Sequence, residues 1–431
     1  MYKFDVAMDA QTAMKERVVW MLYLGLMFFL LYGSANQYAS LTAPHPSFVF
    51  GWDHNIPFIE SFIVPYMASD LMFVVAFLLP YRRLELRILA LRVFAIVGFS
   101  VLLFLLFPLQ FAFEKPEPQH FQWLFGVLSA DLPFNQAPSL HVSFAIVLWY
   151  SMKEQMASTF FRLLLALWFG LIALSTLFVY QHHFIDLPTG ALVGFLAVYF
   201  ISKRRESKIL KAFMTPRSLK MALYYLVASA LFMVLAFQVS VWFLYLFASL
   251  FFVSVVYAFG LHERVMEYRL SYVLLLPYYI ENYLSYRYYR PKLELMVEVK
   301  EGVYFGRFPM FEEYAQIKEQ GIHAVLNLAW EQPRIDKINL FRKRLPLLDQ
   351  TIPDPKLLHE AVLFIEEHKN EGVFVHCALG LSRSVLVISA WLLYCGHGRD
   401  EVEKIMLKIR SDYVKSEYMG IGLDIYEKNY L

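Results

Sequence analysis

The stretch that decides the fold of the C-terminal third is His376-Cys377-Ala378-Leu379-Gly380-Leu381-Ser382-Arg383-Ser384, which follows the apolar run Val373-Phe374-Val375. A buried strand that leads into a loop and then a helix surrounds an anion with backbone N–H groups and the positive end of the helix. The same field favours the thiolate form of a cysteine, which is the nucleophile. The spacing Cys-x5-Arg-Ser therefore predicts a phosphate-binding loop with a reactive thiolate.

The side chains of this loop have separate expected tasks. Cys377 is the expected nucleophile, and Arg383 offers a planar fork for two phosphate oxygens. Ser384 is expected to stabilise the departing thiolate when a phosphocysteine is hydrolysed. Asp349, 28 residues before Cys377, is the first candidate for the general acid, and Asp354 is the alternative. The phosphate is expected to lie against the backbone of Ala378, Leu379, Gly380, Leu381 and Ser382, together with Arg383.

The surrounding pattern predicts an α/β domain. Strands are expected at 303–305, 324–328 and 373–375, and helices at 356–368 and 384–395. Strands that alternate with helices favour a partly parallel sheet with its site at the C-terminal end of a strand. The two cysteines, Cys377 and Cys395, do not form a secreted disulfide framework and fit a reducing cytosol. Cys395 is expected to be buried in the last of these helices.

These residues resemble the dual-specificity branch of the protein tyrosine phosphatase superfamily, over roughly residues 298–431. The resemblance implies Cys377 as nucleophile, Arg383 as phosphate ligand and Asp349 as general acid. The alternative is a chance Cys-x5-Arg after a strand. Family members that act on polyanionic inositol lipids often carry Lys or Arg inside the loop, whereas this loop is neutral between Cys377 and Arg383. That difference favours a single phosphomonoester, on a lipid or on a protein residue.

The rest of the chain has the composition of a membrane protein, with 58% hydrophobic and 18% charged residues. Because a span needs roughly 20 apolar residues, the fourth and sixth of about eight candidate spans are marginal. The first candidate is expected to be a retained anchor, with a cleaved signal peptide as the alternative. The candidates cover residues 18–37, 61–80, 93–113, 139–157, 163–181, 184–201, 219–238 and 240–260.

Positive charge is distributed unevenly between the two sets of connecting segments. One set, at 1–17, 82–92, 153–162 and 203–220, is rich in Lys and Arg, whereas the opposite loops contain Lys115 alone. Cytoplasmic loops carry the positive excess, so we expect both termini in the cytosol. The expected domains are a six-span domain at 1–201, two further helices at 202–260, a linker at 261–297 and the phosphatase-like domain at 298–431.

The linker at 261–297 contains eight tyrosines between Tyr268 and Tyr289, interleaved with arginines. Amphipathic Tyr and Arg side chains favour the headgroup layer. We therefore expect the linker to lie at the membrane interface. The alternative, a ninth span, would place Cys377 outside the cell.

A second polar group lies at the outer ends of the fourth to sixth spans. His182 and Asp186 are four residues apart, so the carboxylate can hold one imidazole nitrogen and leave the other to attack. His141, from another span, can then protonate a leaving alkoxide. Ionisable residues at membrane depth are costly and usually functional. The alternatives are histidines that merely lie at the interface, or a catalytically silent relic.

This second pattern resembles the type-2 phosphatidic acid phosphatase superfamily, in particular its sphingomyelin-synthase-like branch, over roughly residues 18–201. The resemblance implies His182 as a phosphohistidine nucleophile, Asp186 as its orienting partner and His141 as the acid. Two features depart from the superfamily pattern. The Lys-x6-Arg-Pro motif is absent, and Thr176 stands where an arginine is expected after Ser175. Transfer of a phospho-headgroup is therefore as consistent with the pattern as hydrolysis.

Together these features predict a membrane-embedded bifunctional phosphatase, similar to enterobacterial inner-membrane tandem phosphatases. The expected substrates are phospholipids or other membrane phosphomonoesters, with a phosphoprotein as a further possibility. No metal, cofactor or nucleic acid is expected. The alternative is a membrane-anchored protein phosphatase whose membrane domain is silent or acts as a scaffold.

Overall fold

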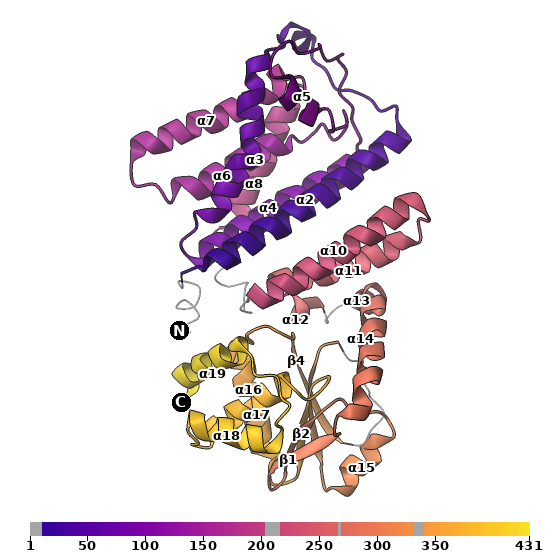
Figure 1. The fold of residues 1–431 in the computed structure, drawn as a ribbon, viewed down its shortest axis with the longest axis vertical. Helices are drawn as coiled ribbons and strands as arrows, with labels where there is room; N and C mark the ends of the chain where they lie inside the picture. Colours follow the sequence, from indigo (N-terminus) through magenta and orange to yellow (C-terminus); the bar gives the residue numbers. More distant parts are fainter. Residues whose placement is uncertain (1–10, 203–215, 266–268, 332–339) are drawn as a thin grey trace. The chain divides into compact units, whose positions relative to one another are not determined.

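The computed structural model describes residues 11–202, 216–265, 269–331 and 340–431. Contacts divide the chain into two compact units, Met1–Ile209 and Leu210–Leu431 (Figure 1). Lys3 and the basic residues between 203 and 211, which support the predicted orientation, lie outside the described residues.

The described part of the first unit is helical. Helices α2 and α4 pack side by side, α6 contacts α4, α7 and α8, and α3 contacts α7. Their bounds are α2 Met14–Thr42, α3 Ile63–Leu78, α4 Arg83–Leu106, α5 Gln122–Leu128, α6 Leu140–Lys153, α7 Thr159–Phe178 and α8 Asp186–Phe200, with short 3-10 turns at Gly51–Asn55 and Glu60–Phe62.

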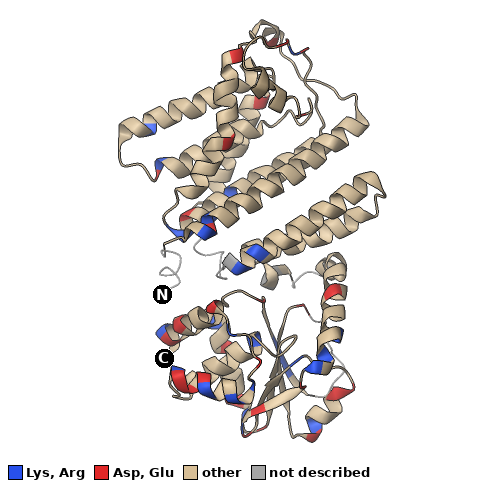
Figure 2. Ribbon diagram, in the orientation of Figure 1, with Lys and Arg blue, Asp and Glu red and all other residues tan. Residues whose placement is uncertain are grey.

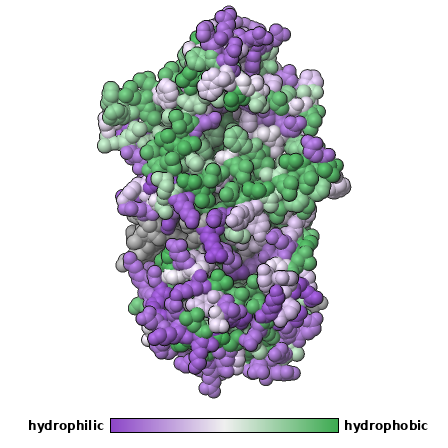
Figure 3. All heavy atoms as spheres, in the orientation of Figure 1, coloured by the Kyte–Doolittle hydropathy of each residue, from purple (hydrophilic) through white to green (hydrophobic). Residues whose placement is uncertain are grey.

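Five helical segments of the described chain are long and apolar enough to cross a membrane: Met14–Thr42, Glu60–Leu78, Arg83–Leu106, Thr159–Phe178 and Arg217–Gln238. The segments expected to be marginal are short helices, since α6 has 14 residues and α8 has 15. Apolar side chains cover much of the visible surface of these helices in Figure 3. The count of about eight spans therefore stays a prediction.

Helices α6 and α8 approach each other closely through glycines. A Cβ on Gly190 would lie 2.4 Å from Ser139 O, and one on Gly194 would lie 3.1 Å from Ile146 Cβ. In the resulting contact Ser143 Oγ donates to Gly190 O at 2.8 Å, and Ser139 N donates to Asp186 O at 3.0 Å. The first turns of the two helices are thus held together.

The second unit begins with a helical hairpin. Helix α10, Pro216–Gln238, packs along α11, Phe243–Phe259, and α11 ends at Gly260 in the left-handed conformation. Three shorter helices follow, α12 His262–Val265, α13 Arg269–Leu274 and α14 Leu276–Tyr289, and then the 3-10 turn Arg290–Lys292. Helices α13 and α14 both pack against α11.

The rest of the second unit is built on a five-stranded sheet of order β1-β2-β5-β3-β4. Strand β1 is antiparallel to β2, and the other neighbouring strands are parallel. This arrangement confirms the predicted α/β class and the partly parallel sheet. The strands are β1 Met296–Lys300, β2 Val303–Gly306, β3 Ala324–Ala329, β4 Phe341–Leu347 and β5 Val373–His376.

Helices cover both faces of this sheet. Helices α16 to α19 gather on one face and α14 and α15 on the other (Figure 1). Lys, Arg, Asp and Glu positions are frequent along the ribbon of this domain (Figure 2). Amphipathic α16 turns its apolar stripe towards α17, which is buried along most of its length. The helices are α15 Glu313–Glu319, α16 Pro355–His368, α17 Arg383–Tyr394, α18 Arg399–Ile409 and α19 Glu417–Tyr430.

Candidate functional site

The quoted loop joins the central strand β5 to helix α17. All four residues of β5 are buried between β2 and β3, so the strand delivers Cys377 to its C-terminal end in a fixed register. Gly380 has φ +74°, and a Cβ there would lie 2.5 Å from Gly306 C. Only glycine fits both this conformation and this close approach.

Two carbonyl groups of the loop bond to residues outside it. Ala378 O accepts from Phe308 N at 3.1 Å, and Leu381 O accepts from Val414 N at 2.9 Å. In a trans peptide the N–H of the next residue points the opposite way, so the amides of Leu379 and Ser382 point into the loop. Helix α17 begins immediately afterwards, and its N-terminus adds partial positive charge. The loop has the geometry of an anion cradle.

Cys377 lies at the base of this cradle and is buried, with 2% of its surface exposed. Its Sγ accepts the Gly380 N–H at 3.2 Å and lies 3.5 Å from Ser384 Oγ. The neighbouring His376 is also buried, and burial lowers the pKa of its imidazole to about 3. The residue that precedes the thiol in sequence therefore carries a neutral imidazole at pH 7.

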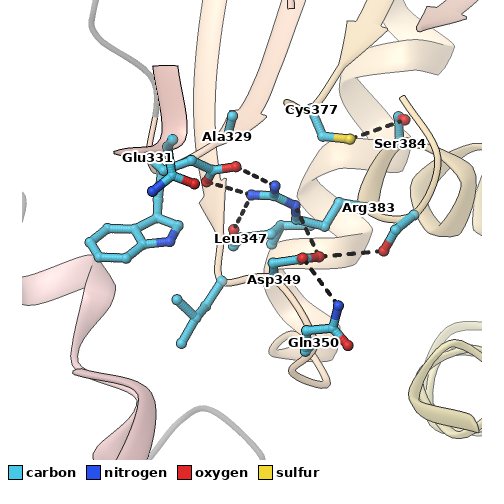
Figure 4. Close-up of polar contacts among 12 residues, drawn as sticks. Ala329, Glu331, Leu347, Asp349, Gln350, Cys377, Arg383 and Ser384 are labelled. Atoms are coloured by element: carbon cyan, nitrogen blue, oxygen red, sulfur yellow. Dashed lines mark hydrogen bonds and ion pairs between the residues drawn. The ribbon is translucent and has the colours of Figure 1, made fainter. Parts of the chain in front are cut away.

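Arg383 is held by a partner that the sequence pattern did not indicate. Its Nη1 donates to Glu331 Oε2 at 2.7 Å and to Leu347 O at 3.0 Å, and its Nη2 donates to Glu331 Oε1 (Figure 4). The Glu331 carboxylate raises the pKa of Arg383 further above its usual range, although burial alone would lower it. Glu331 is 52 residues away in sequence, and no motif spacing relates it to the loop.

Asp349 lies at the edge of the site, as the sequence predicts. Its Oδ1 is 3.6 Å from Arg383 Nε, an ion-pair distance, and accepts from Ser382 Oγ at 3.5 Å. The alternative general acid, Asp354, instead caps helix α16 by accepting the Lys356 N–H at 2.9 Å. The geometry thus favours Asp349 over Asp354.

The expected burial of Cys395 is wrong. Helix α17 ends at Tyr394, so Cys395 is its C-cap residue and is exposed. The apolar face of α17 is turned to the sheet and to the neighbouring helices, and the residue just past the last turn faces solvent instead.

The first unit brings the three other predicted residues together. His182 Nδ1 lies 3.1 Å from Asp186 Oδ2, and the rings of His141 and His182 are 6.2 Å apart between centroids. His183 has a different environment, because its Nε2 accepts the Ala112 N–H at 3.1 Å and its ring stacks on a phenylalanine. The close approach of α6 and α8 is what brings His141 to the other two residues.

Comparison with known proteins concerns the C-terminal domain. Residues 303–418 match the family model described as "Dual specificity phosphatase, catalytic domain". Human dual specificity protein phosphatase 12 is 38% identical over 107 residues, which are 23% of this chain and 31% of that protein. Dual specificity protein phosphatase OPG106 of vaccinia virus (strain Western Reserve) is 31% identical over 102 residues, which are 23% of this chain and 59% of that protein.

Solved structures are also similar to part of this chain. The crystal structure of Tk-PTP in the active form is 26% identical, with a TM-score of 0.30, and the match covers 31% of this chain and 97% of that chain. The chain spans 31% and 59% of the lengths of the two curated relatives.

Proposed function

We propose that this chain dephosphorylates membrane phosphomonoesters through Cys377. The premise is that residues 303–418 are a dual-specificity phosphatase domain, which makes the chain a phosphoric monoester hydrolase. The observation that carries the proposal is the position of Cys377 Sγ at the base of the anion cradle, 3.2 Å from the Gly380 amide. A substrate phosphate held in the cradle presents its phosphorus atom to this sulfur.

The proposed reaction has two steps. Cys377 Sγ forms a bond to phosphorus while the bond to the leaving oxygen breaks, and Asp349 gives that oxygen its proton. Water then attacks the phosphocysteine, Asp349 takes up its proton, and the S–P bond breaks to release phosphate. Arg383 and the inward amides stabilise the phosphoryl oxygens in both steps. Ser384 Oγ, 3.5 Å from Sγ, stabilises the departing thiolate.

Two cysteines of the chain supply a matched test. We expect Cys377→Ser in the full chain, reconstituted in lipid nanodiscs, to abolish hydrolysis of p-nitrophenyl phosphate. Exposed Cys395 lies outside the site, so Cys395→Ser should keep the wild-type rate. Activity that survives Cys377→Ser would overturn the proposal.

The linker helices α13 and α14 have one buried side and one exposed apolar side, and this arrangement supports a substrate in the membrane. Buried Leu275, which caps α14, and buried Tyr278 and Tyr286 within α14 form one stripe, spaced by three and eight residues, as one side of a helix requires. The other side exposes large apolar and aromatic side chains, 62% exposed for Leu284 and 65% for Tyr288. Tyr and apolar side chains of this kind favour the interface of a bilayer.

The orientation completes this part of the proposal. The packing of α13 and α14 on α11 of the apolar hairpin favours placement of the exposed face in the inner leaflet. The charge distribution between the loops favours a cytosolic position for both termini. The resemblance to enterobacterial inner-membrane tandem phosphatases favours a bacterial inner membrane. The Cys377 site would then act on headgroups at the inner surface.

Substrate class can be tested directly with the full chain in nanodiscs. We expect release of phosphate from phosphatidylglycerol phosphate in the disc to exceed release from soluble phosphotyrosine and phosphoserine peptides. Turnover of the peptides alone would replace this proposal with a membrane-anchored protein phosphatase, whose membrane domain is silent or acts as a scaffold.

A second candidate function concerns the first unit. The ion-pair distance between His182 Nδ1 and Asp186 supports a nucleophilic Nε2, and His141 is close enough to serve as the acid. We propose that this group, on the outer face, hydrolyses a lipid phosphate or transfers a phospho-headgroup. The shortage of positive charge, with Lys115 alone in the outer loops, favours a substrate of low negative charge.

The neighbouring histidines provide the control for this site. His182→Ala should remove a lipid-phosphate activity that Cys377→Ser leaves intact, as measured by lipid phosphate analysis of membranes with each variant. His183→Ala should retain more of that activity, because His183 Nε2 is occupied by a backbone amide. Unchanged lipid phosphate turnover in His182→Ala would reduce the first unit to an anchor or scaffold.

A further inference from the structure

The phosphate-binding arginine is oriented by Glu331. The side chains of Arg383 and Glu331 are 6% and 4% exposed, so the pair is screened from water. A carboxylate that takes both Nη atoms fixes the plane of the guanidinium fork as well as its position. The orientation of Arg383 towards a phosphate therefore depends on where the Glu331 carboxylate is held.

Glu331 is positioned by the residue before it. Trp330 directly follows strand β3 and has no exposed surface. Its ring stacks on Tyr278 of α14, with centroids 5.2 Å apart and planes 30° apart, and His262 of α12 lies edge-on at 6.4 Å. The carbonyl of Trp330 accepts from Arg344 Nη2 at 3.1 Å. The backbone that leads into Glu331 is therefore anchored on helices from outside the phosphatase domain.

Tyr278 is itself fixed by the helical hairpin. It is 2% exposed, and its ring lies 5.8 Å from that of Tyr225 in α10. Tyr225 in turn stacks on Tyr257 of α11, at 5.7 Å and 19°. A continuous series of aromatic contacts thus runs from helices α10 and α11 to Trp330, the residue before Glu331.

We propose that Tyr278 and Trp330 are positioning residues for Arg383, so that helices α10, α11 and α14 complete the phosphate site. The inference rests on the proposed phosphatase function. Loss of the stack between Tyr278 and Trp330 lets the backbone at the end of β3 move, so the Glu331 carboxylate is no longer held in one position. The guanidinium group of Arg383 is then no longer preorganised for the phosphoryl oxygens. Preorganised groups contribute more to the transition state than to ground-state binding.

The test uses the full chain in nanodiscs with p-nitrophenyl phosphate as substrate. Tyr278→Leu keeps an apolar side chain and loses the flat ring, Tyr278→Phe keeps the ring, and Tyr283→Leu on the exposed face of α14 is the control. We expect Tyr278→Leu to lower kcat by about 10- to 100-fold with a smaller change in KM, as loss of transition-state orientation does. Tyr278→Phe should recover most of the rate, and Tyr283→Leu should match the wild type.

Orthovanadate separates positioning from simple loss of folded protein. Unfolding of part of the sample lowers the number of active sites but leaves the vanadate inhibition constant of the remainder unchanged. The proposal expects that constant to rise by about tenfold in Tyr278→Leu, because vanadate binds as an analogue of the transition state. An unchanged constant, or a Tyr278→Phe rate as low as that of Tyr278→Leu, would overturn it.

A double-mutant cycle provides an independent check. If Tyr278 acts through Glu331, the fold-losses of Tyr278→Leu and Glu331→Gln should not multiply in the double variant. Losses that multiply would show that the two residues act separately and would overturn the inference. This failure differs from failure of the phosphatase function, in which the wild-type chain would itself leave p-nitrophenyl phosphate intact.

Discussion

The two groups of functional residues are assembled in different ways. The Cys377 site is a short continuous loop between one strand and one helix, so its nucleophile, amides and arginine come from nine neighbouring residues. The His182 site takes its residues from two separate helices and the turn between α7 and α8, and the α6–α8 contact at Gly190 brings His141 to it. The residues of the Cys377 loop can be identified from sequence spacing alone, whereas the proximity of His141 to His182 also depends on helix packing.

Removal of each nucleophile separately is the strongest test of the difference between the Cys377 and His182 sites. We expect Cys377→Ser to lower p-nitrophenyl phosphate hydrolysis at least ~10⁴-fold, as loss of a covalent nucleophile does. His182→Ala should leave that rate unchanged. Steady-state kinetics on the two variants in nanodiscs would show the difference. A large loss in His182→Ala would mean that the two sites are not independent.

The next largest effect should come from the general acid. Asp349→Asn should lower kcat by roughly 10²- to 10³-fold for an alkyl phosphate, since general-acid catalysis contributes about that much. The loss should be smaller for p-nitrophenyl phosphate, whose leaving group needs no proton. Asp354→Asn is the control, because the amide oxygen of asparagine can still accept the Lys356 N–H and cap helix α16, and the site is left intact. Equal losses for the two substrates would argue against an acid role for Asp349.

The His182 site should be sensitive to the packing of α6 against α8. Gly190→Ala places a Cβ 2.4 Å from Ser139 O, which forces α8 away from α6 and His141 away from His182. We expect a roughly 10- to 100-fold loss of the outer lipid-phosphate activity, because such displacement costs about this much in rate. Gly170→Ala in α7, where a Cβ has open space, should have no effect. The Cys377 activity should be unchanged in both variants.

The smallest expected effect is on stability in acid, and it comes from His376, which precedes Cys377. His376 has a folded pKa of about 3 through burial, below its usual 6.5, so the unfolded chain binds one more proton between these values. The stability that the neutral imidazole contributes is present above about pH 6.5 and is lost as pH falls towards 3, at up to roughly 1.4 kcal/mol per pH unit. Thermal unfolding of the second unit against pH, compared with His376→Asn, would measure this slope. Identical slopes would contradict the assignment.

The sequence predicts those parts of the fold that have a local signature. Strands β2, β3 and β5 and helices α16 and α17 match their expected ranges to within one or two residues at each end. Strand β4 was missed because Arg342, Lys343 and Arg344 interrupt its apolar pattern at the edge of the sheet. Strand β1, the other edge strand, alternates charged and apolar residues and begins at Met296, before the expected domain boundary.

Long-range partners were beyond sequence reasoning. The pairing of Glu331 with Arg383, and of Trp330 with Tyr278, depends on how the linker helices pack on the sheet, and periodicity carries no record of it. The exposure of Cys395 turned on the single residue at which α17 ends, and helix ends are the least certain feature of a sequence pattern.

The covalent intermediate tests the central claim most directly. The full chain in nanodiscs would be mixed with ³²P-labelled substrate, quenched with acid within one turnover and digested, and the labelled peptide would be identified by mass spectrometry. We expect a phosphorylated Cys377 in the wild type, a longer-lived one in Ser384→Ala, and none in Cys377→Ser. A labelled peptide from another part of the chain, or turnover without label on Cys377, would contradict the account.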